Sequence, residues 1–209
     1  MKNEQMRILK RAMVAVGVIL VAGGALGAGC IEDRLVDIVA GGEITVPLQA
    51  RGTTNVFGDP IVIDLTGATG ADIQQIISEN GFEEGSTRAV LESISYRVTS
   101  PDPTQTRTIN GTITIAPQGG AAEPLVSLGS IAVDDPANQS WVSVPLTQAG
   151  TTIVNTALAN YLQNNIPAVL TLEINGTSEP ANVSTNFDWE LKIVLSIAGK
   201  KKLQVINPL

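Results

Sequence analysis

The 209-residue chain contains no histidine, and this absence removes several kinds of chemistry at once. Without imidazole the chain cannot assemble a Ser-His-Asp triad or a Cys-His pair, and it lacks the commonest ligand of zinc and copper sites. A single cysteine, Cys30, means that no disulfide can form within the chain. Aromatic residues make up only 3% of the sequence, which leaves few side chains for a stacking platform.

Enzymatic routes that remain would use carboxylate pairs or lysine, and three acidic clusters are candidates for such work or for calcium binding. They are Glu83–Glu84, Asp134–Asp135, and Asp188 with Glu190 on one strand face. No spaced set of calcium ligands accompanies them, and turn formation also explains Asp before Pro and Glu before Gly. We therefore predict a protein that is not an enzyme and that needs no metal or cofactor.

The N-terminus has the order of segments found in an export signal. Four basic residues occur within the first eleven positions, and no charged residue occurs from Ala12 to Gly29. The stretch ends in "GALGAGC", so the hydrophobic run stops directly before Cys30. In an oxidising compartment a lone reactive thiol would be a hazard. The position of Cys30 directly after the hydrophobic run therefore suggests that its thiol is modified.

This segment resembles the signal peptide of bacterial lipoproteins, whose lipobox reads Leu, a small residue, Gly or Ala, then Cys. Here Gly27 occupies the usual leucine position and Leu26 lies one residue earlier. The resemblance implies that residues 1–29 are removed and that Cys30 becomes a lipidated first residue, which anchors the protein to a membrane. Two other interpretations stay open: Cys30 follows a plain secretory signal, or residues 12–29 remain as an uncleaved anchor.

The resemblance also implies a location in the cell envelope. The residue after the cysteine is Ile31 rather than Asp, which in lipoproteins of double-membraned bacteria implies the outer membrane, facing the periplasm or the cell surface. In a source with one membrane, the outer face of the plasma membrane is the alternative. Loss of the leader takes four basic residues and one acidic residue from totals of 13 and 20, leaving a formal charge of −10. A chain this acidic is not expected to bind nucleic acid.

Alternation of apolar and polar residues dominates the rest of the chain and predicts β-strands. The clearest run is "FDWELKIVLSI", in which six apolar residues between Phe187 and Ile197 share one face. Strands with one apolar and one polar face are typical of antiparallel sheets packed face to face. We therefore predict a mainly β fold, an antiparallel β-sandwich of immunoglobulin-like general architecture, with its first strand near Glu43.

Two segments follow the helical period instead, and they predict two short helices at residues 70–80 and 151–165. Each comes after a strand that ends in Leu-Thr, and Leu65 matches Leu146 at an offset of 81 residues. Each is also followed by two strands. The pattern raises the hypothesis that a strand-helix-strand-strand unit is duplicated.

The predicted organisation is a signal peptide at residues 1–29, a lipidated N-terminus and short tether at 30–42, and one sandwich at 43–209. Within the sandwich, the candidate repeats cover residues 43–116 and 125–209. Two small domains separated at 117–124 are the alternative. A half of this size with few aromatics would have a thin core, so a single sandwich is favoured.

The two tryptophans receive different predictions. Trp189 is in phase with the apolar face of its strand and is expected in the core. Trp141 is out of phase with Val142 and Val144, so we expect it to be exposed, as the one candidate binding aromatic. "NGT" at Asn110 and at Asn175 predicts turns.

Near the end of the chain, Gly199 and the lysines at 200–202 predict a hairpin turn before a short last strand. Contact of these lysines with anionic lipid head groups is the alternative.

Two functions fit these observations. The first is a non-catalytic, membrane-anchored lipoprotein that acts as an interaction or structural module for another, unidentified envelope protein. The second is a carrier of a lipid or other apolar ligand, since 44% of the residues are hydrophobic and could line a cavity as well as fill a core.

Overall fold

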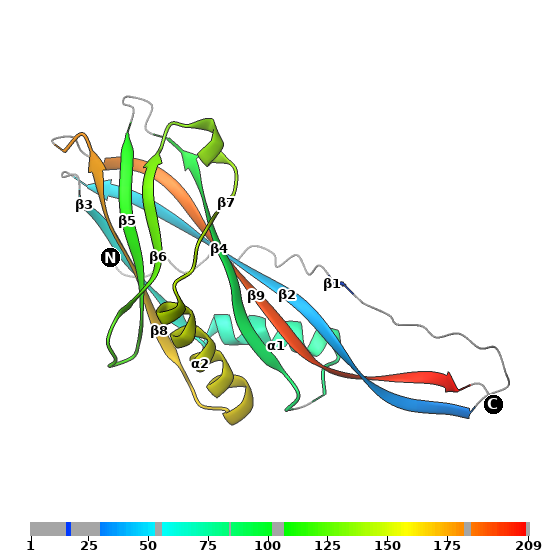
Figure 1. Ribbon diagram of the computed structural model, residues 1–209. Helices are drawn as coiled ribbons and strands as arrows, with labels where there is room; N and C mark the ends of the chain where they lie inside the picture. The colour runs from blue at the N-terminus through cyan, green and yellow to red at the C-terminus, as the bar shows by residue number, and fades with distance from the viewer. Residues whose placement is uncertain are drawn as a thin grey trace.

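The computed structural model describes residues 16–17, 30–52, 56–83, 85–101, 107–181 and 185–207. The described chain is mainly β: two antiparallel sheets pack face to face as a sandwich, with two helices (Figure 1). The predicted fold class is confirmed. The predicted signal peptide lies outside the described residues except for β1 (Val16–Gly17), which pairs with Val39 and Ala40.

The strands divide between a five-stranded and a four-stranded sheet. The five-stranded sheet has the order β1-β2-β9-β4-β7, in which the longer members are β2 (Cys30–Gly52), β9 (Thr185–Asn207) and β4 (Arg88–Ser100), and β7 spans Val142–Val144. The four-stranded sheet has the order β3-β8-β5-β6, formed by β3 (Val56–Asp64), β8 (Val169–Glu179), β5 (Thr108–Pro117) and β6 (Glu123–Ala132).

Both predicted helices are present. They are α1 (Ala68–Asn80) and α2 (Gln148–Asn164), and a short 3-10 helix, η1, spans Pro136–Gln139. The Thr147 side chain caps α2 by accepting a hydrogen bond from the Gly150 backbone N–H at 3.2 Å. Halfway along α2, Asn155 Oδ1 accepts the Leu91 backbone N–H at 2.8 Å, next to a bulge in β4. This bond fixes the helix against the five-stranded sheet.

The interior follows the alternation seen in the sequence. Phe187 and Trp189 of β9 are buried, and Phe57 of β3 reaches them from the opposite sheet. The Phe57 ring packs edge-on against Phe187 and Trp189, with centroid distances of 5.8 and 6.5 Å. The ring also lies over Gly176 of β8, where an added Cβ would come within 2.3 Å of Phe57 Cζ. The absence of a side chain at Gly176 therefore makes room for the aromatic cluster that joins the two sheets.

Strands β2 and β9 pair over their entire length of 23 residues each. The next strand, β4, pairs with β9 only as far as Ala198, so β2 and β9 continue beyond it as a two-stranded ribbon (Figure 1). The prediction that the first strand starts near Glu43 was wrong, since residues 30–42 belong to β2. The predicted hairpin turn at Gly199 was also wrong, because β9 runs through it without a break.

Specific contacts explain why the ribbon overrides the local turn signal. Gly199 leaves space for the Phe82 ring, since an added Cβ would lie 2.5 Å from Phe82 Cδ1. Lys202 forms an ion pair with Asp33 across the strands, with an Nζ–Oδ2 distance of 2.7 Å. The hydrogen bond from this ammonium to Asp33 and the charge of Asp33 raise the pKa of Lys202. Glycine and lysine here therefore serve strand pairing rather than a chain reversal.

The two candidate repeats have equivalent connectivity. Each begins with a strand (β2 or β6), followed by a strand, a helix and two further strands. Read from β2, the five-stranded sheet runs β2-β9-β4-β7, and read from β6 the other runs β6-β5-β8-β3. The two orders match when each strand is replaced by its counterpart in the other half: β2 by β6, β9 by β5, β4 by β8 and β7 by β3. In both sheets the first strand of one half pairs with the last strand of the other half. The halves thus interleave in one sandwich; the duplication itself stays a prediction.

We predict that Gly176→Ala destabilises the sandwich by about 1–3 kcal/mol, because the new methyl group displaces the Phe57 ring from a filled core. Chemical denaturation followed by circular dichroism measures the change. Gly41→Ala is the matched control, since a Cβ at Gly41 meets no atom within 4 Å. Equal effects of the two substitutions would contradict the proposed role of Gly176.

Candidate functional site

The tetrapeptide Ile-Asn-Gly-Thr occurs twice in the chain, at residues 109–112 and 174–177. The first copy lies in β5 and the second in β8, and these strands are direct antiparallel neighbours. Their register places Asn110 opposite Thr177, Gly111 opposite Gly176, and Thr112 opposite Asn175. The two copies are therefore related by an approximate twofold axis through the glycine pair.

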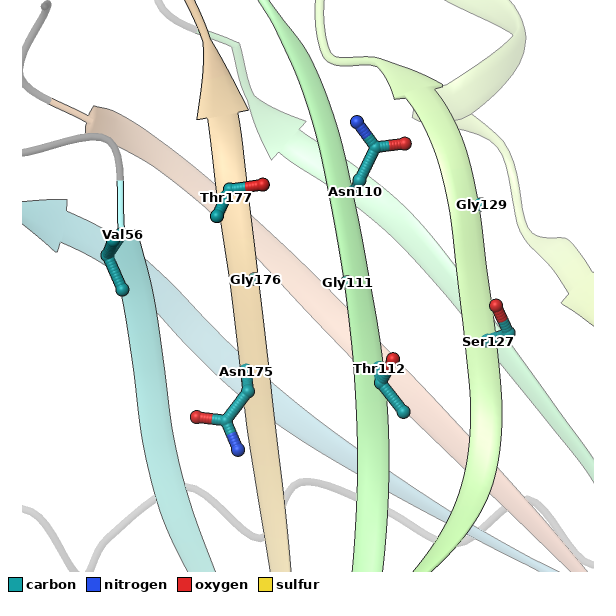
Figure 2. A pocket seen from close by; sticks show the side chains of 9 residues that line it. All are labelled: Val56, Asn110, Gly111, Thr112, Ser127, Gly129, Asn175, Gly176 and Thr177. Carbon is teal, nitrogen blue, oxygen red and sulfur yellow. The ribbon is translucent and has the colours of Figure 1, made fainter. Parts of the chain in front are cut away.

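A hollow of about 560 Å³ lies over this pair on the outer face of the four-stranded sheet (Figure 2). Its floor is a row of three glycines on adjacent strands, Gly176, Gly111 and Gly129. On either side of this row stand the side chains that complete the lining: Val56, Thr177 and Asn110 on one side, and Asn175, Thr112 and Ser127 on the other. The result is a shallow trough that crosses the strands between two polar walls.

The prediction of turns at Asn110 and Asn175 was wrong, because both residues lie inside strands. The Asn-Gly signal for a turn is local, and strand pairing on both sides of β5 and β8 overrides it. A signal for the correct result was present in the sequence. Apolar residues alternate in phase through each motif, from Ile109 to Ile113 and Ile115, and from Leu170 and Leu172 to Ile174.

The identity of the two motifs is not a by-product of the candidate duplication. The motifs are separated by 65 residues, from Ile109 to Ile174, whereas the halves match at an offset of 81, from Leu65 to Leu146. In the equivalent connectivity of the halves, β5 corresponds to β9 and β8 corresponds to β4. The paired motifs therefore occupy positions that the repeat does not relate, which calls for an explanation in the hollow itself.

The chemistry of the hollow is neutral and polar. None of its lining residues carries a charge, and none is aromatic. Asparagine amides and threonine or serine hydroxyls can each donate and accept hydrogen bonds. Val56, at 61% exposure, adds an apolar contact at the edge of the sheet. Such a surface can bind an uncharged ligand through hydrogen bonds.

The predicted lipidation site lies at the opposite end of the molecule from the hollow. Cys30 is the first residue of β2, and its backbone pairs with Asn207 at the tip of the ribbon. Strand β2 then runs along the whole sandwich to Gly52, and Val56 at the edge of the hollow begins the next strand (Figure 1). The ribbon tip and the hollow are thus separated by nearly the full length of the longest strand.

Trp141 is half-buried on the outer face of the five-stranded sheet, and its ring already has partners. The Arg97 guanidinium lies 4.6 Å and the Lys192 ammonium 4.8 Å from the ring centroid, which are cation–π contacts. Arg97 is also ion-paired with Glu190 at 2.7 Å, and Lys192 approaches Glu43 at 3.8 Å. The ring of Trp141 is therefore already in contact with side chains of the protein itself. A role of Trp141 in ligand binding stays a prediction.

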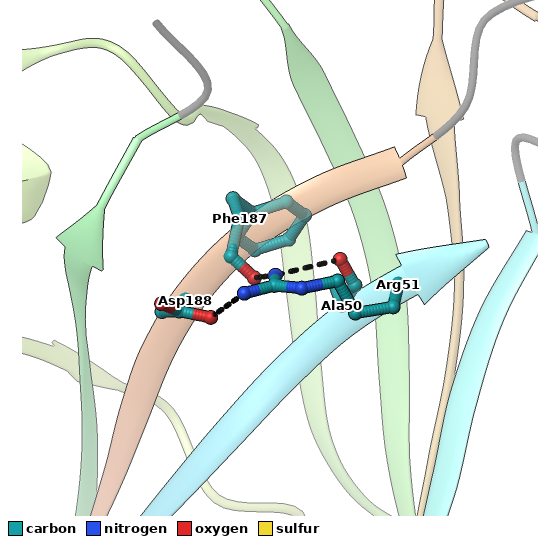
Figure 3. Close-up of polar contacts among 4 residues, drawn as sticks. All are labelled: Ala50, Arg51, Phe187 and Asp188. Carbon is teal, nitrogen blue, oxygen red and sulfur yellow. Dashed lines mark hydrogen bonds and ion pairs between the residues drawn. The ribbon is translucent and has the colours of Figure 1, made fainter.

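The two carboxylates predicted on β9 point outward from the five-stranded sheet and are both ion-paired. Asp188 pairs with Arg51, whose guanidinium also donates to the Phe187 carbonyl oxygen at 2.7 Å (Figure 3). Glu190 pairs with Arg97 as described above. Both carboxylates therefore connect neighbouring strands, which is a structural role.

The other acidic candidates serve local structure or lie at the surface. Asp135 caps η1, since its Oδ1 accepts the Ala137 backbone N–H at 2.9 Å. Glu83 closes a turn by accepting the Ser86 hydroxyl at its carbonyl oxygen. Asp134 is exposed, and Glu84 lies outside the described residues. Among the described residues, no group of three or more acidic or cysteine side chains is arranged to hold a metal ion.

Neither helix in the described part of the chain has the length and apolar character needed to cross a bilayer.

No protein-family model matches the chain, and no curated protein sequence matches it. Two solved structures of infectious bursal disease virus, from the Gx and Gt strains, are distantly similar, each at 10% sequence identity. They cover 90% and 96% of this chain, with TM-scores of 0.28 and 0.25. The chain spans less than half of each viral chain, 42% and 48% respectively. At these TM-scores the similarity carries no argument about function.

We predict that Trp141→Leu lowers the free energy of unfolding by about 1–2 kcal/mol, because two cations lose the face of the indole ring. In a background with Arg97→Gln and Lys192→Gln, the same substitution is expected to cost clearly less. Urea denaturation of the four proteins completes this double-mutant cycle. A cost that is the same in both backgrounds would show that the ring is not held by the cations.

Proposed function

We propose that this protein is a non-catalytic binding module, anchored by a lipid on Cys30 and displaying the hollow of the four-stranded sheet away from the membrane. The observation that carries the proposal is the course of β2, which starts at Cys30 and ends four residues before Val56 of the hollow. The strand therefore runs from the proposed anchor to the end of the sandwich at which β3, the edge strand of the hollow, begins. The lipoprotein-like signal that precedes Cys30 supports the anchor.

The length and the double-stranded form of the ribbon support this arrangement. A strand of 23 residues spans roughly 70 Å when extended, and twisting shortens it somewhat. Pairing with β9 along the whole length makes the connection a double strand rather than a flexible tether. A module built in this way holds its hollow well clear of the lipid head groups, where an envelope partner or ligand can reach it.

The absence of a catalytic role is supported by the contacts of the acidic candidates. Asp188 and Glu190 are each neutralised by an arginine, and Asp135 is used as a helix cap. The sequence contains no histidine that could act in their place. An outer-membrane location, with a second envelope protein as partner, follows from the lipoprotein resemblance and is part of the proposal.

The alternative function, transport of an apolar ligand, has less support. A small hollow lined by Phe57, Ile174 and Trp189 measures about 10 Å³, which is room for no more than one water molecule. The facing side chains of the two sheets fill this part of the interior, with Ile113, Ile174 and Leu191 at or below 2% exposure.

We predict that Cys30→Ser abolishes acylation and moves the protein from the membrane fraction to the soluble fraction or to an unprocessed precursor. Intact-mass analysis of detergent-extracted protein measures the lipid, and fractionation measures the location. Ile31→Asp is the matched control, since it keeps the cysteine and is expected to stay acylated and membrane-bound. An unmodified Cys30 in the native protein would overturn the anchoring proposal.

A further inference from the structure

We infer that the hollow over the paired Ile-Asn-Gly-Thr motifs binds a neutral saccharide. The inference rests on the proposed function, because it names the ligand class of the same module. Its starting point is the juxtaposition of Asn110 with Thr177 and of Thr112 with Asn175 around a shared glycine pair. Four side chains that can both donate and accept hydrogen bonds thus surround one shallow floor.

The lining excludes charged ligands. A phosphate or carboxylate ligand would require a cation or a set of converging backbone N–H groups, and no arginine or lysine lines the hollow. A divalent cation would require carboxylates, which are also absent from the lining. An uncharged ligand that is rich in hydroxyl groups matches amide and hydroxyl walls on both sides.

The position of the hollow on the sheet argues against an extended peptide. Peptides that bind sheets commonly add a strand at an open edge, where backbone groups are unpaired. The two motifs lie on β5 and β8, each of which pairs with a strand on both sides. The β5–β8 ladder runs through both motifs without a register shift, so its backbone groups are already paired; the one shift at Gly111 and Thr112 lies on the β6 side, and recognition falls chiefly to side chains. Hydroxyl groups distributed around a saccharide ring suit such recognition better than a peptide backbone does.

The geometry also indicates the size of the ligand. The volume of about 560 Å³ lies within the range of roughly 300–1,000 Å³ typical of small-molecule sites. The approximate twofold relation presents one asparagine and one threonine on each side of the glycine floor. A ligand with hydroxyls at both ends, the size of a short oligosaccharide, can use both sets at once. The shallow form of the trough predicts weak binding, strengthened when many modules share one membrane.

The test is calorimetric titration of the full-length protein in detergent with three neutral tetrasaccharides: chitotetraose, cellotetraose and maltotetraose. We expect at least one to bind at millimolar concentration. Substitution of both Thr112→Val and Thr177→Val should weaken this binding about tenfold or more, since it removes two hydrogen-bonding hydroxyls but keeps the β-branched shape. Thr171→Val, on the same strand face outside the hollow, is the matched control and should bind like the original protein.

A second readout localises the ligand independently of affinity. The side-chain amide signals of Asn110 and Asn175 in nitrogen-15 correlation spectra should shift on titration, while that of Asn155 on α2 should not. The saccharide proposal is overturned if none of the three probes gives heat or shifts these amides, or if binding survives unchanged in the double valine variant. An acylated, membrane-bound protein that binds none of the probes would overturn this inference alone. A saccharide-binding protein with an unmodified Cys30 would instead overturn only the anchor.

Discussion

The pairing of β2 with β9 is the constraint on which the rest of the molecule depends. These strands join opposite ends of the described chain, from Cys30 against Asn207 to Gly52 against Thr185, without a bulge. On the sandwich they supply two strands of the five-stranded sheet, and beyond it they form the ribbon. The same register that buries Trp189 and Leu191 in the core thus also sets how far Cys30 extends from it. The ribbon and the core part of the five-stranded sheet are thus formed by the same two continuous strands.

Close approach at glycine connects this core to the outer surface. Gly176 and Gly111 occupy inward-facing positions of their strands, and the missing side chain at Gly176 lets the Phe57 ring lie against β8 on the inner face. On the outer face the same backbone row forms the floor of the hollow, because side chains at inward-facing positions do not project there. The close approach of Phe57 explains why the interior of β8 carries Gly176, although glycine weakens strands through its conformational entropy.

Local periodicity made the sandwich predictable, and long-range register made the site unpredictable. Alternation of apolar residues along β9 and the helical spacing in α1 and α2 are properties of short segments, and the structure confirms them. The two Asn-Gly pairs carried an equally local signal for turns, and it failed because β5 and β8 meet across a separation of 65 residues. The hollow arises only from that meeting. In the same way, the role of Lys202 depends on its ion pair with Asp33, which is distant in the sequence.

The equivalent connectivity of the two halves has a consequence for how the chain acquires its structure. Every ladder among strands β2 to β9 joins a strand of residues up to 117 with a strand of residues from 123 onward. Apart from the short β1–β2 pair, neither half contains a strand pair of its own, so the sandwich has the topology of a strand-exchanged dimer whose two chains are joined through residues 118–122. Folding therefore brings together two incomplete halves, and except for β1 beside β2 the strands of the first half gain their partners only when the second half has been made.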